Sequence, residues 1–118
     1  MKWYDELDYR LNNTLEKRLS EHRHISNKYP GSIPIFVESD KKLSVKTKKY
    51  IIGNHYQFGT FIYAFRKKNR LMPSEAFFFF TKNNTVISST SPMSSLFKEH
   101  GSDDGMLYIR VSKESCYG

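Results

Sequence analysis

The four histidines are the side chains whose spacing can be tested most directly for metal or acid–base chemistry. His22 and His24 stand two residues apart, so on a helix they point to different faces and cannot share one metal ion. His55 and His100 stand alone in the sequence. The sequence also lacks a glycine-rich phosphate loop. We therefore predict no metal site, no cofactor and no enzymatic activity.

Basic side chains offer a different chemistry, the binding of anions. The sequence carries a formal net charge of +7, and nine of its nineteen Lys and Arg residues fall between Lys41 and Arg70, where no acid occurs. Such asymmetry indicates a nucleic-acid backbone, an anionic lipid surface or an acidic protein segment as partner. A solvated surface without a partner is a further alternative. Charge alone does not rank these alternatives.

The final residues, ESCYG, place a glycine at the end of the sequence. Gly118 adds no side-chain contact and costs more conformational entropy to order than any other residue. Chain ends are also commonly frayed. From these residues alone, two hypotheses stay open: an end without a role, and an end that carries chemistry.

Length and composition predict one folded domain. The 118 residues lie within the size range of a single domain, and nine Phe, eight Tyr and one Trp supply core material. The single cysteine, Cys116, cannot form an internal disulfide, and no charged-then-apolar leader opens the sequence, which favours the reducing cytoplasm. No apolar run approaches membrane-spanning length. Residence on a membrane would therefore need an attached group.

The elements that must position these residues begin with two helices in residues 1–29. Apolar side chains recur near helical spacing at Leu15, Leu19 and Ile25. Asn13, with Glu16 three residues later, forms a capping pair for the second helix. Two strands follow, IPIFVE and KKYIIG, which we expect to be antiparallel. Pro34 lacks an N–H, so it argues for an edge strand or a locally exposed position.

A third helix should lie across the sheet. Its apolar stripe follows the i, i+3, i+4, i+7 pattern and comprises Phe58, Phe61, Ile62 and Phe65. Asn54 and Gln57 form a capping pair before it, and RKKNR ends it, where the helix dipole also favours basic residues.

The last third of the sequence predicts two strands around a short helix. AFFFFT is uniformly apolar, which indicates a strand covered on both faces. In SPMSSLFKEHG, Ser91 would cap a helix with Pro92 at its first position and Gly101 past its end. MLYIRVS alternates, with one face formed by Leu107, Ile109 and Val111.

This order predicts an α+β, ubiquitin-like β-grasp fold: a four-stranded mixed sheet with a crossing helix, preceded by two N-terminal helices. We expect one domain over residues 1–118. Its parts would be a helical extension over 1–29, the β-grasp core over 32–112 and a tail over 113–118. In this fold the final strand leads into a free tail, whose terminal glycine is often the reactive end.

Seven segments stand in the order of a known family: KYPGSIPIFVE, KKYIIG, FGTFIYAFRKK, AFFFF, MSSLFKEH, DDGMLYI and ESCYG. From about Leu15 to Gly118 the sequence resembles the ubiquitin-like modifiers of autophagy, the GABA-receptor-associated-protein and light-chain-three group. Three residues depart from the family pattern. Ser32 stands for a usual basic residue, Gly53 for a proline and Met106 for a phenylalanine, and Met106 would make its pocket more adaptable.

The resemblance implies that Gly118 is joined to the membrane lipid phosphatidylethanolamine. In the family, an activating enzyme adenylates the terminal carboxylate, and catalytic cysteines of activating and conjugating enzymes carry the acyl group. A processing cysteine protease trims longer precursors. Tyr117 and Gly118 would be recognised by these enzymes, and glycine has no Cβ to obstruct attack on its thioester. The protein would be cytoplasmic, and held by two acyl chains on autophagosome or vesicle membranes when lipidated.

The resemblance also implies docking of receptor and adaptor proteins through short aromatic-x-x-aliphatic motifs. KKYIIG would be the edge strand that such a peptide extends. The aromatic pocket would be lined by Glu21, Ile25, Pro34, Lys49, Ile51 and Met106. The aliphatic pocket would be lined by Tyr50, Ile52, Tyr56, Phe61 and Ala64. Acids preceding the motif would meet Lys46, Lys48, Lys49 and Arg66 to Lys68. Phe61, as a member of the helix stripe, also fits ordinary core packing.

Two other functions stay as alternatives. The first is a basic nucleic-acid-binding domain that uses the interleaved aromatic and basic residues, although we expect no specific nucleic-acid partner. The second is a non-conjugated peptide-docking adaptor in vesicle trafficking.

Overall fold

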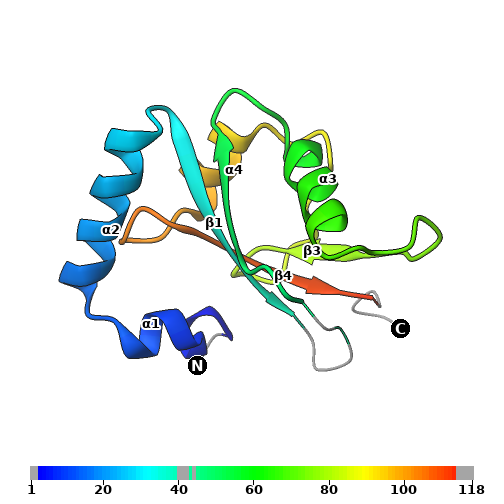
Figure 1. Ribbon diagram of the computed structural model, residues 1–118, viewed down its shortest axis with the longest axis horizontal. Coiled ribbons are helices and arrows are strands. Elements are labelled where there is room, and N and C mark those ends of the chain that lie inside the picture. Colours follow the sequence, from blue (N-terminus) through cyan, green and yellow to red (C-terminus); the bar gives the residue numbers. More distant parts are fainter. Residues whose placement is uncertain (1–2, 40–42, 44, 114–118) are drawn as a thin grey trace.

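A four-stranded sheet in the order β2-β1-β4-β3 forms the centre of the protein, with helices on both faces (Figure 1). The computed structural model describes residues 3–39, 43 and 45–113. In chain order the elements are η1 (Trp3–Glu6), α1 (Asp8–Asn12), α2 (Leu15–Lys28), β1 (Ser32–Ser39), β2 (Lys49–Gly53), α3 (Phe58–Lys68), β3 (Phe78–Phe80), α4 (Met93–His100) and β4 (Leu107–Ser112). The predicted α+β, ubiquitin-like fold is confirmed, and the 3₁₀ turn η1 adds to the two expected N-terminal helices.

β1 is an inner strand of this mixed sheet. It pairs antiparallel with β2, as predicted, and parallel with β4, so the first and last strands lie side by side. β3 pairs antiparallel with β4. β2 therefore lies at the outer edge of the sheet, next to the strand that follows the N-terminal helices.

Pro34 lies in this inner strand, at a point where the ladder needs no N–H. Val37 N–H donates to Lys48 O and Asn54 N–H donates to Gly31 O, both at 2.8 Å. Bonded pairs alternate in an antiparallel ladder, so the proline falls in a non-bonded pair and its nitrogen faces the β4 side. The β1–β4 pairing begins only at the next residue. The prediction of an edge strand is therefore wrong, and Pro34 is buried and not locally exposed: the register instead leaves its nitrogen without a ladder partner.

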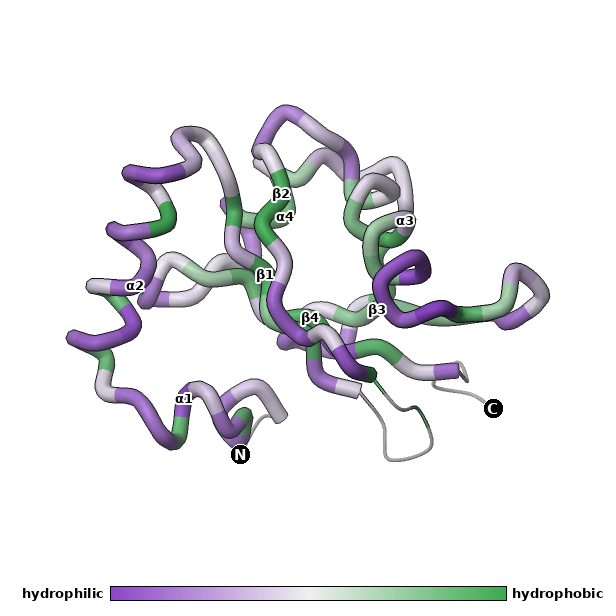
Figure 2. The backbone as a smooth tube through the Cα atoms, in the orientation of Figure 1, coloured by the Kyte–Doolittle hydropathy of each residue, from purple (hydrophilic) through white to green (hydrophobic). Residues whose placement is uncertain are grey.

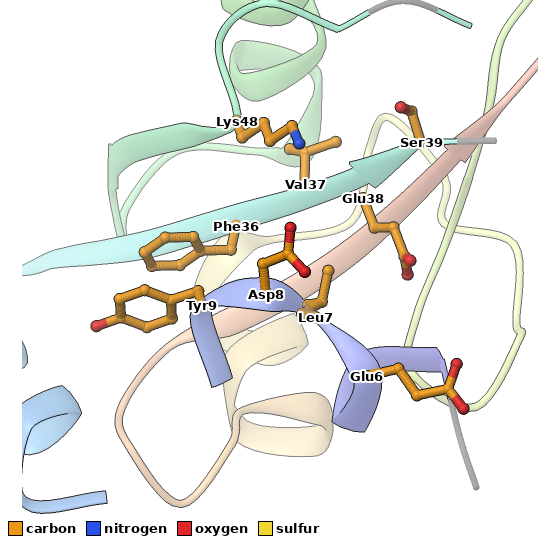
Figure 3. Close-up of a pocket in the computed structure, with 9 residues that line it drawn as sticks. All are labelled: Glu6, Leu7, Asp8, Tyr9, Phe36, Val37, Glu38, Ser39 and Lys48. Carbon is orange, nitrogen blue, oxygen red and sulfur yellow. The ribbon is translucent and has the colours of Figure 1, made fainter. Parts of the chain in front are cut away.

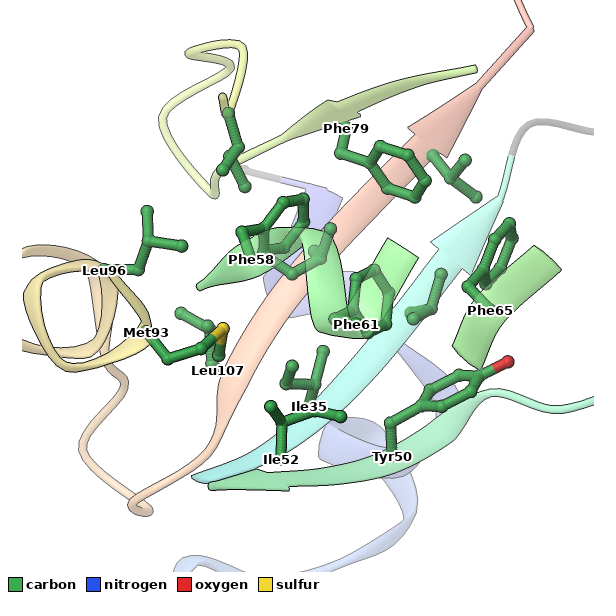
Figure 4. Packing of buried hydrophobic residues seen from close by; sticks show 14 of the residues in the cluster. Ile35, Tyr50, Ile52, Phe58, Phe61, Phe65, Phe79, Met93, Leu96 and Leu107 are labelled. Atoms are coloured by element: carbon green, nitrogen blue, oxygen red, sulfur yellow. The ribbon is translucent and has the colours of Figure 1, made fainter. Parts of the chain in front are cut away.

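Three phenylalanines of α3 fill the space between that helix and the sheet (Figure 4). Phe58, Phe61 and Phe65 are fully buried. The ring of Phe79 meets each of them edge to face, with centroids 5.5, 5.7 and 5.6 Å apart. Burial of one phenylalanine contributes about 1.5–3 kcal/mol, and edge-to-face pairs add to it. The predicted stripe is the core face of α3, although Ile62 is only partly buried at its border.

The two later strands follow their predicted patterns. In β3, Phe79 and Phe80 face opposite sides and are 4% and 1% exposed, so the strand is covered on both faces. In β4, the core face is formed by Leu107, Ile109 and Val111. Gly101 ends α4, as expected, at a point where an added Cβ would lie 2.5 Å from the Phe97 carbonyl oxygen.

The N-terminal segments cover the second face of the sheet. α2 is hydrophilic along most of its length (Figure 2) and buries only Arg18 and Ile25. Ile25 packs with Met106 and Tyr108. The apolar residues that border this cluster are Trp3, Tyr4, Leu7, Tyr9 and Phe36. The aromatic residues near the start of the sequence thus form a second, smaller core.

A buried ion pair joins α2 to the turn before β4. Arg18 Nη1 donates to Asp104 Oδ2 at 2.7 Å, and Asp104 has no exposed surface. The Tyr108 hydroxyl donates to the same oxygen, while Met106 N–H donates to Oδ1 at 2.9 Å. Burial raises the pKa of Tyr108, and its hydrogen bond to Asp104 raises it further. These donors make burial of the carboxylate tolerable.

The predicted cap of α2 is displaced by one residue. Thr14, and not Asn13, is the N-cap, and its hydroxyl oxygen accepts from Lys17 N–H at 3.2 Å. Asn13 instead ends α1, where its Nδ2 donates to Tyr9 O at 2.8 Å. The two helices follow so closely that one asparagine serves the first while the next residue begins the second.

The starts of α3 and α4 satisfy each other through their backbones. Phe58 N–H donates to Ser91 O at 2.8 Å, and Met93 N–H donates to Tyr56 O at 2.9 Å. The N-cap residues are Gln57 and Pro92, and neither makes a side-chain cap. The predicted caps Asn54 and Ser91 are therefore wrong, because backbone carbonyls from the opposite helix start supply acceptors.

Candidate functional site

The outer edge of β2 presents backbone groups that point away from the sheet. In the alternating ladder of β1 and β2, Lys49 and Ile51 stand in non-bonded pairs with β1. Their N–H and C=O groups therefore face outward. Within the described part of the chain, β2 pairs with β1 alone. This edge can accept an additional strand.

An apolar groove runs between β2 and α3, beside this edge. Its lining residues are Tyr29, Lys49, Tyr50, Ile51, Ile52, Ala64 and Lys68. Tyr50, Ile52 and Ala64, three of the five residues predicted for the aliphatic pocket, meet here. Phe61 lies behind them, fully buried, with its ring edge to face with Tyr50 at 5.2 Å. Tyr56 is exposed and packs on His55.

Asn69 holds the groove in shape and was not predicted from the sequence. Its Nδ2 donates to the Tyr50 hydroxyl at 2.8 Å, and its Oδ1 accepts from Lys46 N–H at 2.8 Å and Thr47 N–H at 3.2 Å. The Tyr50 hydroxyl donates to Thr47 O at 2.9 Å. Burial raises the pKa of Tyr50. Asn69, the residue after α3, thus fixes the chain just before β2. In the sequence, the only signal for this role was its position after RKK.

The residues predicted for the aromatic pocket converge between α2 and β2, but its floor is closed. Ile25 and Met106 are 4% and 0% exposed and pack in one cluster, and Pro34 is buried. Glu21 of α2 accepts a hydrogen bond from Lys49 Nζ of β2. An ion pair therefore joins the two elements that flank the predicted pocket.

Tyr9 of α1 also contacts this pocket, which sequence reasoning missed. Its ring stacks on Phe36 with centroids 4.1 Å apart, and its hydroxyl donates to Glu21 Oε2. Burial raises the pKa of Tyr9, and the hydrogen bond and charge of Glu21 raise it further. Burial would also raise the pKa of Glu21, but hydrogen bonds from Lys49 and Tyr9 outweigh it and hold that pKa below its usual value.

The basic residues expected beside the groove have different surroundings. Lys48 and Lys68 are exposed, so their ammonium groups can meet acids of a ligand. Arg66 instead donates to Met72 O at 3.4 Å and to Glu75 O at 2.9 Å, and so fastens the loop after α3. Its charge faces the groove less directly than the sequence suggested.

A second cavity lies between α1 and β1, outside the predicted site (Figure 3). Its walls include Glu6, Asp8, Tyr9, Phe36, Glu38 and Lys48. The stacked rings of Tyr9 and Phe36 are shared with the surroundings of the aromatic pocket. This cavity combines three carboxylates, from Glu6, Asp8 and Glu38, with apolar and aromatic side chains.

Gly118, the predicted attachment residue, and Tyr117, predicted with it for enzyme recognition, lie outside the described residues, which end at Lys113 just after β4. Lys113 Nζ lies 2.8 Å from Glu75 Oε2. In the described ranges every helix is too short or too polar to cross a bilayer. The same residues contain no group of three or more His, Cys, Asp and Glu side chains arranged for a metal ion.

Comparison with known proteins gives concordant matches in sequence and structure. Residues 17–118 match the family model described as "Autophagy protein Atg8 ubiquitin like". Autophagy-related protein 8a of Arabidopsis thaliana is 36% identical over 113 residues, which cover 93% of this chain and 92% of that protein. Autophagy-related protein 8d of the same plant is 39% identical over 108 residues, 88% of each chain. The crystal structure of Trypanosoma brucei ATG8 superposes with a TM-score of 0.81 at 26% identity, covering 95% of this chain and 98% of that one.

Proposed function

We propose, since the chain belongs to the Atg8 family of ubiquitin-like autophagy proteins, that it is a modifier joined through Gly118 to phosphatidylethanolamine. In that state it recruits proteins that carry aromatic-x-x-aliphatic motifs to autophagosome or vesicle membranes. It is the substrate of activating, conjugating and processing enzymes and has no catalytic role of its own.

The conjugation proposal assigns simple chemistry to Gly118. The family match extends to residue 118, which supports this residue as the acyl donor. A partner enzyme adenylates its carboxylate, carrier cysteines hold it as a thioester, and the lipid amine displaces the thiolate to form an amide. The absence of a Cβ leaves the carbonyl open to attack. Two acyl chains then give stable anchoring, which one chain provides only marginally.

The docking proposal is carried by one observation, the open edge of β2 beside an apolar groove. A ligand strand would bond to the outward N–H and C=O groups of Lys49 and Ile51. Its aliphatic side chain would enter the groove against Tyr50, Ile52 and Ala64. Its preceding acids would meet Lys48, an exposed residue just before β2, and Lys68 of the groove lining.

Ile51→Ala tests the docking surface. Ile51 is 37% exposed on the edge strand, so its truncation removes ligand contact with little effect on the core. We expect binding of a synthetic acidic peptide containing Trp-x-x-Leu to weaken by about 1–3 kcal/mol in calorimetry. Val86→Ala is the matched control, because Val86 is 52% exposed and lies outside the groove. Equal affinities of wild type and Ile51→Ala would remove the β2 edge as the docking site.

A further inference from the structure

Four residues from four different elements meet beside the predicted aromatic pocket. Tyr9 of α1 stacks on Phe36 of β1, and its hydroxyl donates to Glu21 of α2. Lys49 of β2 donates to the other oxygen of the same carboxylate and lies 5.8 Å from the Phe36 ring centroid. Phe36 and Lys49 are also direct partners in the β1–β2 register. Each of the four residues therefore contacts other members of the same cluster.

The Glu21–Lys49 ion pair obstructs the seat proposed for the ligand's aromatic ring. That seat lies between α2 and β2, and the ion pair joins these two elements. Its floor residues Ile25 and Met106 are 4% and 0% exposed, so the floor is shut off from solvent in this state. A ring that enters between α2 and β2 would therefore meet the ion pair that joins them.

Tyr9 limits how freely this ion pair can open. A carboxylate on a helix surface ordinarily rotates among several positions, and exposed ion pairs contribute little because of the entropy of holding two long side chains. Here the Tyr9 hydroxyl donates to Oε2 of Glu21, while Lys49 donates to Oε1 of the same carboxylate. The Tyr9 ring is itself fixed by its stack on Phe36, 17° from parallel.

We propose that Tyr9 of α1 is a positioning residue that holds the Glu21–Lys49 pair closed over the aromatic seat. In this way α1 would control entry of the ligand's aromatic side chain. This inference rests on the proposed docking function and adds a regulatory element to that site. When the pair opens, Lys49 keeps a favourable position over the face of Phe36. The Lys49 and Glu21 side chains are 38% and 33% exposed, so water can solvate both charges when the pair opens.

Tyr9→Phe tests the proposal, because it removes the hydroxyl and keeps the stacked ring. We expect the variant to bind the acidic Trp-x-x-Leu peptide about three- to tenfold more tightly, which corresponds to loss of one hydrogen bond from the closed state. The gain should appear mainly as faster association in stopped-flow fluorescence. A peptide with Ala in place of Trp should bind both proteins equally. Tyr4→Phe is the control, since Tyr4 lies in the same segment but stacks on Tyr108.

Two further measurements distinguish this gate, the Glu21–Lys49 pair held by Tyr9, from a general effect on folding. In a Glu21→Ala background, Tyr9→Phe should have no added effect on affinity, because the gate is already absent. Independently of any ligand, Tyr9→Phe should raise the pKa of Glu21, measured by carboxyl NMR titration, because one of its two hydrogen-bond donors is lost.

The outcomes distinguish the gate from the docking function. Peptide affinity that is unchanged or weaker in Tyr9→Phe, with Ile51→Ala still impaired, would overturn the gate and leave the docking site in place. An unchanged pKa of Glu21 would overturn it as well. If the wild-type protein binds no Trp-x-x-Leu peptide while the pKa of Glu21 still rises, the docking function is refuted, and the gate with it, although the Tyr9–Glu21 contact stands.

Discussion

Asp104 is an acidic residue that is fully buried in this small protein. Its side chain has no exposed surface, and it accepts hydrogen bonds from Arg18, Tyr108 and the Met106 backbone. Arg10 Nη1 lies 3.5 Å from Oδ2, so a second guanidinium supports the first. The carboxylate ties both N-terminal helices to β4, because Arg10 of α1 and Arg18 of α2 form ion pairs with it and Tyr108 of β4 donates to it.

Arg18→Ala should therefore destabilise the fold strongly. The variant leaves Asp104 buried with its main charge partner removed, and breaking a buried ion pair costs about 3–5 kcal/mol. Urea unfolding followed by circular dichroism measures this free energy. Lys17→Ala, at the adjacent exposed position, is the control and should change stability by less than about 0.5 kcal/mol. Equal stabilities of the two variants would show that the ion pair contributes nothing to folding.

At the scale of elements, the start of α2 depends on a single side chain. Thr14 accepts from Lys17 N–H, one of the four N–H groups that a helix start leaves without internal partners. Thr14→Ala should lower the free energy of unfolding by about 0.5–2 kcal/mol, whereas Thr14→Ser keeps the acceptor and should restore most of it. Thermal unfolding of the three proteins provides the comparison. An alanine variant as stable as the serine variant would rule out the cap.

The elements with long regular patterns were predictable from the sequence. The α3 stripe and the alternation of β4 follow directly from side-chain periodicity, and the edge position of β2 followed from the resemblance to the family. Pro34 was misplaced because a proline signals a missing N–H, and only the strand register shows whether the ladder needed one there.

The parts of the candidate site that escaped prediction depend on contacts between distant segments. Tyr9 belongs to α1, which is five residues long and too short for periodicity to define a face. Asn69 could be recognised as a helix end, but its reach to Tyr50 depends on how α3 crosses the sheet. Met106 has two possible roles, because the same side chain packs in the small core and was predicted to line the aromatic pocket.

At the scale of the whole molecule, the two cores share one sheet, and we propose that residues 1–118 form a single domain. The larger core lies between α3, α4 and the sheet, and the smaller one between the N-terminal segments and the opposite face. β1 and β4 contribute to both. The aromatic N-terminal segment is thus part of the same packed structure as the groove between β2 and α3.

The net charge of +7 also bears on the nucleic-acid alternative. We expect any RNA or DNA binding to be weak and independent of sequence, and to fall steeply between low and physiological salt, because it would arise from phosphate contacts alone. Fluorescence titrations of two unrelated sequences at several salt concentrations measure this. A sequence-specific complex that persists at raised salt would favour the nucleic-acid function over peptide docking.

Attachment to lipid can be tested by the intact mass of the protein recovered from cell membranes, with fragmentation to locate any addition. We expect a gain the size of a phosphatidylethanolamine on Gly118, and its loss or marked reduction in Gly118→Ala. A membrane-bound protein of unmodified mass, or one whose addition lies on another residue, would contradict it.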